Sequence, residues 1–337
     1  MKTRYTLLVL ILLSTRSHAQ DVPLFQSQEP VNLRITGSIK SIKKKSNDST
    51  FVSGKFLYEQ DAQWITVPVQ ARVRGNFRLK NCYFPPLKLK FSKKDVASTV
   101  FNGNKALKLV VPCQTRSDKN DLIRKEYLCY QIYRAVSPYY FRTRLANVEM
   151  TEVSQKKPRS FELLAFFVED NSMVAKRSQG KVIKSKSVNP AAFDEKQSVR
   201  NDYFQYMIGN ADWSTVYQHN SNTLFANGKY IPLSYDFDMS GFVNAGYARE
   251  NPPQLGTGDP RDRVYRGFCK SRAAMEEIRQ EFLQKEPAVA LLIESESSNF
   301  SKYELNDMQG YINGFFEILK NDDKFKASIL EHCRTQQ

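Results

Sequence analysis

The sequence predicts an α+β protein whose strands come first and whose helices come last. Residues 65–111 contain runs in which apolar and polar residues alternate, which is the period of half-buried β-strands. From Asp121 on, apolar residues recur four apart, and two amphipathic patterns of this kind end the chain. The 337 residues, 41% of them hydrophobic, suffice for one large domain or two lobes, and the 22 Phe and 17 Tyr exclude a mainly disordered chain.

The first residues have the order of a secretory signal peptide. Lys2 and Arg4 precede a short apolar stretch, residues 5–13, and a polar segment then ends in small residues at Ala19. The apolar stretch is too short to span a bilayer. We therefore expect residues 1–19 to be removed and the mature protein to be exported, to the periplasm, the medium or the cell surface, without a transmembrane segment.

The five cysteines matter because an exported protein meets oxidising conditions. They allow at most two disulfides and leave one thiol over. The sequence does not fix the connectivity, and proximity along the chain favours Cys82 with Cys113 and Cys269 with Cys333. Cys129 lies in a helical pattern, which is typical of a small core residue.

Three strands are expected first. Residues 65–73 alternate, and Pro68, which has no amide donor, suggests that this strand lies at a sheet edge. Residues 74–76, Arg-Gly-Asn, predict a turn. Residues 87–91 and 107–111 alternate apolar residues with lysines, so each of these strands carries lysine on the face opposite its apolar set.

The remaining elements follow in chain order. A helix is expected from Asp121 until Pro138 stops it. We then expect strands at 144–153 and 161–168, a mobile loop at 176–192, a helix at 203–208, a hairpin at 222–235, and helices around 275–282 and 305–319. This order places strand-rich structure in residues 20–168 and mainly helical structure in residues 169–337.

Residues 209–241 contain the side chains that most clearly indicate chemistry. Asp212, Asn220, Asp236 and Asp238 are oxygen donors, and a hairpin between them would bring the Asp212 loop against the strand that carries Asp236. Such donors suit Mg²⁺, which binds through one or two carboxylates and phosphate oxygens. An Asp, an Asn, a hairpin and a further Asp is also the order found in phosphoryl-transfer enzymes of the kinase type. Because Asp, Asn and Gly favour turns, a plain loop is the alternative.

The first half contains candidates for nucleotide contacts. Lys108 lies in the strand directly before the helix that carries Glu126, and such a Lys–Glu pair would fix the α and β phosphates. Lys90 and Lys88 are alternates for this lysine. Each of these lysines is otherwise explained as a solvent-facing residue of its strand. The apolar strand that ends at Glu169 resembles a strand that leads into a hinge, where backbone groups would meet an adenine.

Five blocks carry a resemblance to a known family: VRGNFRL with PPLKLKF, LIRKEYLCYQIYRAV, FELLAFFVED and GNADW…HN…YDFDMSG. Together they resemble the spore-coat-protein-H (CotH) kinase-like family and, more closely, exported bacterial hypothetical proteins with the same order of blocks. The resemblance spans roughly residues 30–330. It implies an atypical protein-kinase-like two-lobed fold, with an antiparallel-sheet N-lobe that holds one helix and a mainly helical C-lobe.

The resemblance also implies an activity: ATP and Mg²⁺ or Mn²⁺ would be used to phosphorylate Ser or Thr of extracytoplasmic proteins. Asp212 would be the catalytic residue, Asn220 a metal ligand, and Asp236 the principal metal ligand with Asp238 beside it. The alternative is a catalytically inactive kinase-like module that binds or adheres at the cell envelope.

The sequence departs from the kinase pattern in three respects. The spacing of eight residues from Asp212 to Asn220 exceeds the five of ordinary kinase catalytic loops, so Asn222 is a second candidate for the metal. The glycine-rich phosphate loop is missing, and Arg74 with the following Gly75 is the nearest substitute. An exported enzyme also meets little ATP.

Other classes of function fit less well. The chain has three His, and His219, the candidate general base for a hydrolase, comes without a nucleophile elbow. The cysteines and histidines lack zinc-site spacing. The net charge of +15, which falls to +12 without residues 1–19, is spread along the chain, and its main basic runs lack interleaved aromatics. An anionic cell-envelope surface, an acidic protein substrate or plain solubility explains this charge better than nucleic-acid binding.

Overall fold

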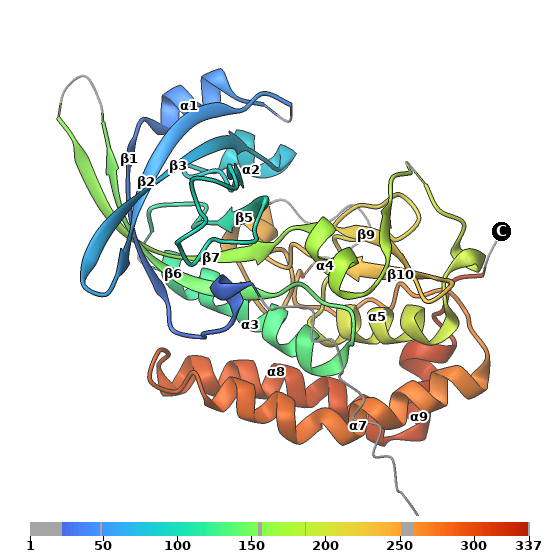
Figure 1. Cartoon of the computed structure of the whole chain (residues 1–337). Helices are drawn as coiled ribbons and strands as arrows, with labels where there is room; N and C mark the ends of the chain where they lie inside the picture. Colours follow the sequence, from blue (N-terminus) through green and yellow to red (C-terminus); the bar gives the residue numbers. More distant parts are fainter. Residues whose placement is uncertain are drawn as a thin grey trace, which may run out of the picture.

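Seven strands in the first half of the chain close into a β-barrel in this computed structural model, which describes residues 22–47, 49–116, 118–153, 157–185, 187–250 and 259–335 (Figure 1). Their order around the barrel is β1-β2-β3-β4-β5-β7-β6. The strands are β1 (Val31–Gly37), β2 (Val52–Gln60), β3 (Gln63–Val73), β4 (Leu87–Lys90), β5 (Ala106–Val110), β6 (Thr143–Glu152) and β7 (Arg159–Glu169). All neighbouring pairs are antiparallel except β1 and β6, whose parallel pairing closes the barrel.

The predicted kinase-like two-lobed fold, with an antiparallel-sheet N-lobe that holds one helix, is therefore wrong. The structure has a closed seven-stranded barrel of mixed strand direction, followed by a helical region. Three helices, α1 (Ile39–Lys45), α2 (Asn76–Asn81) and α3 (Lys119–Val136), occur between the barrel strands instead of one. The division at residues 168 and 169 stays a prediction, and the predicted signal peptide, residues 1–19, lies outside the described residues.

The individual strands predicted from alternation are confirmed as β3 to β7. Pro68 of β3 lies opposite Lys55 of β2, and the pairing of β3 with β4 begins only at Gln70. The proline therefore occupies a stretch of the closed barrel where β4 does not pair with β3, so the predicted edge position holds locally. The predicted turn at Arg74 is followed at once by α2, which was not predicted.

In the second half of the chain, the long helices lie below the barrel and a small sheet lies to its right (Figure 1). The helices are α4 (Asn171–Arg177), α5 (Glu195–Met207), α6 (Gly246–Glu250), α7 (Arg272–Glu294), α8 (Lys302–Lys320) and α9 (Asp322–Phe325), with short helical turns at Pro23–Phe25, Pro190–Ala192 and Lys326–Leu330. The sheet has the order β10 (Lys229–Ser234), β9 (Ser221–Ala226), β8 (Lys181–Ile183). Since β8 pairs with β9, the prediction of a mobile loop over residues 176–192 is wrong.

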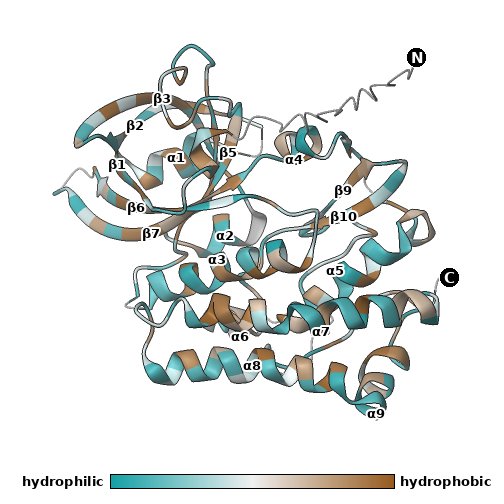
Figure 2. Cartoon of the chain, turned by 60° about the horizontal axis from the view of Figure 1, so that its bottom comes forward, coloured by the Kyte–Doolittle hydropathy of each residue, from teal (hydrophilic) through white to brown (hydrophobic). Residues whose placement is uncertain are grey.

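Helix α3 joins the two halves, because it packs against β7 on one side and α7 on the other. In α7 and α8, hydrophobic stripes alternate with hydrophilic ones, as the amphipathic patterns predict (Figure 2). Among the helices that the structure describes, none combines the length and the apolar character needed to cross a membrane.

Two disulfides form, and both predicted pairs are confirmed. Cys82 bonds to Cys113, which fixes the end of α2 to the segment after β5, and Cys269 bonds to Cys333. Cys129 is a free thiol buried in α3, as predicted. The bond between Cys82 and Cys113 holds α2 against the barrel and next to the helical region.

Candidate functional site

The loop after β10 carries Asp236 and Asp238 to the place where the barrel meets the helical region. Asp236 has a φ of +66°, and its backbone N–H donates to the Tyr130 hydroxyl of α3 at 3.0 Å. A left-handed backbone at a non-glycine residue costs about 1–3 kcal/mol, so the surrounding structure must hold it. Asn220 lies opposite with a φ of +48°. Two strained residues among the four predicted oxygen donors mark this place as the candidate site.

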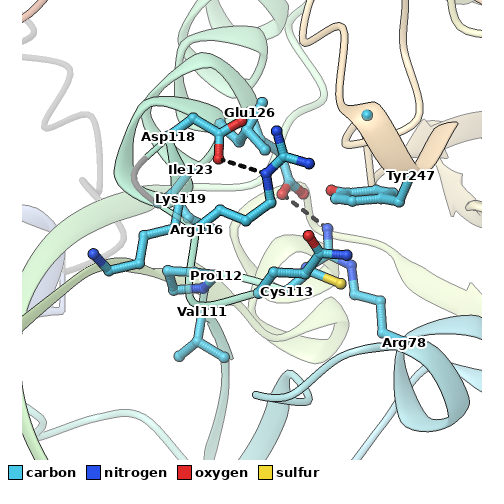
Figure 3. Close-up of a pocket in the computed structure, with 13 residues that line it drawn as sticks. Arg78, Val111, Pro112, Cys113, Arg116, Asp118, Lys119, Ile123, Glu126 and Tyr247 are labelled. Atoms are coloured by element: carbon cyan, nitrogen blue, oxygen red, sulfur yellow. Dashed lines mark hydrogen bonds and ion pairs between the residues drawn. The ribbon is translucent and has the colours of Figure 1, made fainter. Parts of the chain in front are cut away.

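Arg78 of α2 is the centre of a buried cluster of charges. Its guanidinium lies 3.0 Å from Glu126 of α3, 2.6 Å from Asp238 and 3.6 Å from Asp236. The Tyr247 hydroxyl donates to Asp238 at 3.0 Å. Figure 3 shows Arg78, Glu126 and Tyr247 converging from three elements on one small pocket. Arg78, Glu126 and Asp238 are almost fully buried, whereas the Asp236 side chain is 32% exposed.

The three acids of this cluster differ in pKa. Burial raises the pKa of Glu126 to about 8 and that of Asp238 to about 6, and in both cases the Arg78 charge acts in the opposite direction. For Asp236, burial also opposes ionisation, but the charges of Arg78 and Arg74 prevail and hold the pKa below its usual value. At neutral pH Asp236 is therefore ionised and Asp238 is mostly ionised, whereas Glu126 is largely protonated.

A second group of side chains lies in the loop before β9. His219 Nε2 and Asp212 Oδ1 are 2.8 Å apart, and Asn220 Nδ2 donates to Asp212 Oδ2 at 2.9 Å. The Tyr235 N–H donates to the Asn220 carbonyl at 3.0 Å, which joins this loop to Asp236. The structure thus brings Asp212, Asn220 and Asp236 into one place, as the hairpin predicted. The hydrogen bond to Asp212 raises the pKa of His219.

Lys108 faces the same place from the outer side of the barrel. It is buried, and its ammonium lies 4.1 Å from the Tyr235 ring centre and 4.7 Å from that of Phe141. No carboxylate of the described residues forms an ion pair with it. Burial, together with the nearby charge of Arg74, holds the pKa of Lys108 well below its usual range. The Arg74 guanidinium lies over the same Tyr235 ring, at 5.8 Å from its centre.

Three of the residues predicted to contact nucleotide have other partners. The Lys90 ammonium lies 3.9 Å above the Phe51 ring. Glu169 is buried at the end of β7, where its N–H donates to the Arg142 carbonyl and its carboxylate accepts from Arg177. Lys88, the other alternate, pairs with Asp170 at 3.1 Å.

The site residues fit a divalent cation in part. Within the described residues, no cluster of three or more acidic, His or Cys side chains is placed to hold a metal, and the Arg78 guanidinium pairs with both Asp238 and Asp236. Asp236 and Asn220 remain, one ionised carboxylate and one amide whose Oδ1 accepts no hydrogen bond in the described chain. This donor set matches Mg²⁺, which keeps several waters and binds through one or two carboxylates with phosphate oxygens.

A buried polar atom without a partner lies next to this place. Glu126 Oε1 makes no hydrogen bond within the described residues, although its carboxyl is almost fully buried. Such an atom carries a cost of about 1–3 kcal/mol. Protonation, which the raised pKa of Glu126 favours, removes part of that cost.

Sequence reasoning missed Arg78 and Tyr247, and it considered His219 only as the base of a hydrolase. Arg78 sits in a helix of six residues that follows a predicted turn, too short for a periodic signal. The VRGNFRL block was the available pointer, since it ends one residue beyond this arginine. Tyr247 lies 169 residues away along the chain, so only the fold brings it near Arg78.

No protein-family model matches this chain, and no curated protein is significantly similar to it. The site is therefore interpreted from its own geometry.

Proposed function

We propose that the protein is an exported phosphotransferase that uses ATP with Mg²⁺ or Mn²⁺ and phosphorylates Ser or Thr of extracytoplasmic proteins. One observation carries the proposal: Lys108, a buried lysine without an ion-pair partner among the described residues, lies near the ionised Asp236, and the Asp212–Asn220 loop is hydrogen-bonded to Tyr235, the residue before Asp236. Cations and a hard-oxygen ligand side by side are what a metal-bound polyphosphate requires.

The residues have separate roles in this proposal. Lys108 and Arg74 bind phosphate oxygens, and a phosphate beside the ammonium of Lys108 restores the charge that burial disfavours. Asp236 and Asn220 hold the cation, which would neutralise charge on the transferred phosphoryl group. The hydroxyl oxygen of the acceptor forms a bond to the γ-phosphorus, and the bond from that phosphorus to the bridging oxygen of ADP breaks.

Asp212 receives the proton that the acceptor hydroxyl loses. Its carboxylate is held by His219 and Asn220, so it is oriented before the acceptor arrives. Because His219 is largely exposed and bonded to Asp212, it offers the proton a path from the site to the solvent.

The test is transfer of label from γ-labelled ATP to a basic and an acidic carrier protein, with Mg²⁺ or Mn²⁺. Asp236→Asn should abolish transfer, while Glu317→Gln, an exposed acid on α8, should behave as wild type. Nucleotide with metal should also raise the melting temperature, because a ligand at 100 times its Kd stabilises by about 2.7 kcal/mol. A wild-type protein whose melting temperature is unmoved by both ligands would refute the proposal.

The second candidate is a non-catalytic binding module of the cell envelope. The observation that favours it is Arg78, which already pairs with Asp238 and Glu126 and so withdraws two acids from metal binding. This candidate predicts binding of an acidic protein partner that is unchanged in Asp236→Asn, and no label transfer by the wild type.

A further inference from the structure

One end of the barrel holds an apolar cavity that the phosphotransfer site does not use. Its volume is about 340 Å³, within the range of about 300–1,000 Å³ typical of small-molecule sites. Helix α1 lies at its mouth (Figure 1). The walls are inward-facing side chains of the barrel, among them Ile35, Phe56, Val69, Leu89, Leu109 and Met150.

The opposite end of the barrel is filled with aromatic side chains. Phe101, from the connection between β4 and β5, is fully buried. Its ring centre lies 5.2–5.6 Å from those of Phe56, Tyr58, Phe91 and Phe167. Barrels of about eight strands either fill their interior with side chains or hold one small ligand. In this barrel, side chains fill one end, and the other end leaves room for a ligand.

Small residues leave the space open. Gly54 of β2 lies two residues before the inward-facing Phe56 and opposite Val69, so it belongs to the inner face. A Cβ added to Gly54 would meet no atom within 4 Å. Two further lining residues, Ile42 and Met150, are only partly buried although they pack on the barrel core. An apolar ligand would remove this surface from water.

The rim of the cavity is cationic. Lys45 of α1 lines it, its side chain is exposed, and it has no ion-pair partner among the residues that the structure describes. Its neighbour Lys43 differs, because the Lys43 ammonium donates to the Cys82 carbonyl at 2.8 Å. The cavity therefore combines an apolar interior with free positive charge at its opening.

We propose that this cavity binds a single-chain fatty carboxylate, with the alkyl chain inside the barrel and the carboxylate at Lys45. The charge complementarity of the rim favours an anionic amphiphile over a neutral one. It also disfavours a second copy of this basic chain, whose net charge is +15.

The test titrates octanoate, decanoate, dodecanoate and dodecanol into the full-length protein by calorimetry. Wild type should bind dodecanoate at one saturable site, and the affinity should rise about fourfold per methylene. Gly54→Phe fills the cavity and should abolish binding. Gly310→Phe, the same substitution at an open position on α8, should bind as wild type. Lys45→Gln should weaken dodecanoate at least fivefold and leave dodecanol unchanged, whereas Lys44→Gln should change neither.

Three results would overturn the proposal: no saturable binding by wild type, full binding by a folded Gly54→Phe, or equal loss of binding in Gly310→Phe. Where Gly54→Phe does not fold, Gly37→Phe takes its place, since a Cβ there also meets no atom within 4 Å. Equal affinities for dodecanoate and dodecanol would overturn the role of Lys45.

Discussion

At the scale of single residues, Arg78 decides how the candidate site is charged. Its guanidinium lies among three carboxyl groups and is almost fully buried with two of them. Such a cluster is stable only while every charge has a partner, because removing one partner leaves a buried charge uncompensated. Neither the position of Arg78 along the chain nor its local pattern indicates this role, since its partner Asp238 is 160 residues away.

Replacing Arg78 tests this arrangement. Arg78→Met should lower the free energy of unfolding by about 3–5 kcal/mol, because the Asp238 carboxylate loses its cation inside the protein. The matched control is Lys196→Met, which removes a half-exposed ion pair with Glu277 and should cost at most about 1 kcal/mol. Urea unfolding measures the free energy of unfolding of both variants. Equal decreases would show that the buried cluster contributes no more to stability than the half-exposed ion pair.

The raised pKa of Glu126 gives a dependence of stability on pH. An acid whose pKa is higher in the folded state binds more protons when folded, so its contribution favours folding at low pH. With the pKa raised from 4.5 to about 8, stability should fall as pH rises from about 5 to 8. Glu126→Gln should flatten this fall by a few kcal/mol.

The comparison between wild type and Glu126→Gln isolates this residue, because other groups that titrate in the same window remain in both proteins. His219, with its raised pKa, and Asp202, with a pKa of about 7, are two of them. Parallel stability curves for the two proteins between pH 5 and 8 would contradict the assignment.

At the scale of elements, α2 is held by the disulfide rather than by its own length. It has six residues, and the bond from Cys82 to Cys113 follows its last turn. Helices this short are unstable alone. The disulfide pairs were predictable because few cysteines are present and their neighbourhoods suggested partners, whereas α2 was not predictable, since six residues show no period.

Removing that disulfide should therefore affect the site. The double variant Cys82→Ala with Cys113→Ala should lose about 2–4 kcal/mol of stability. It should also lose the rise in melting temperature caused by nucleotide with metal, because α2 no longer holds Arg78 beside Asp236, the proposed metal ligand. Cys269→Ala with Cys333→Ala is the control: it should lose similar stability and keep the ligand response. If the first variant keeps the rise in melting temperature with nucleotide and metal, the position of α2 does not matter for ligand binding.

At the scale of the whole molecule, the two loops of the site are tied together and to α8. The Gly241 N–H donates to the Gly209 carbonyl at 3.0 Å, and the Phe242 N–H donates to the Ile208 carbonyl at 3.0 Å. Tyr311 of α8 packs on both glycines, and its hydroxyl donates to the Arg261 carbonyl at 3.0 Å. The helical region therefore sets the distance between the loop of Asp212 and the loop of Asp236.

Gly209→Ala tests this coupling. Gly209 has a φ of +61°, and an added Cβ would overlap the Tyr311 hydroxyl. The control, Gly228→Ala, has a φ of +75° and meets no atom within 4 Å, so it carries the backbone cost of about 1 kcal/mol alone. We expect Gly209→Ala to lose clearly more stability than Gly228→Ala and to lose label transfer. Equal losses of stability in the two variants would mean that Tyr311 can move aside for the added methyl group.

The sequence by itself determined most of the elements: strands β3 to β7 follow from a period of two residues, and the longer helices from a period of nearly four. It also identified the oxygen donors of the site, from their order between residues 209 and 241. Only the tertiary structure decided the closed barrel, because the parallel pairing of β1 with β6 joins strands more than one hundred residues apart. It also placed Arg78 among the acids and opened the cavity beside Gly54. Periodicity is a local property, whereas strand partners, buried charge and empty space arise from contacts between distant residues.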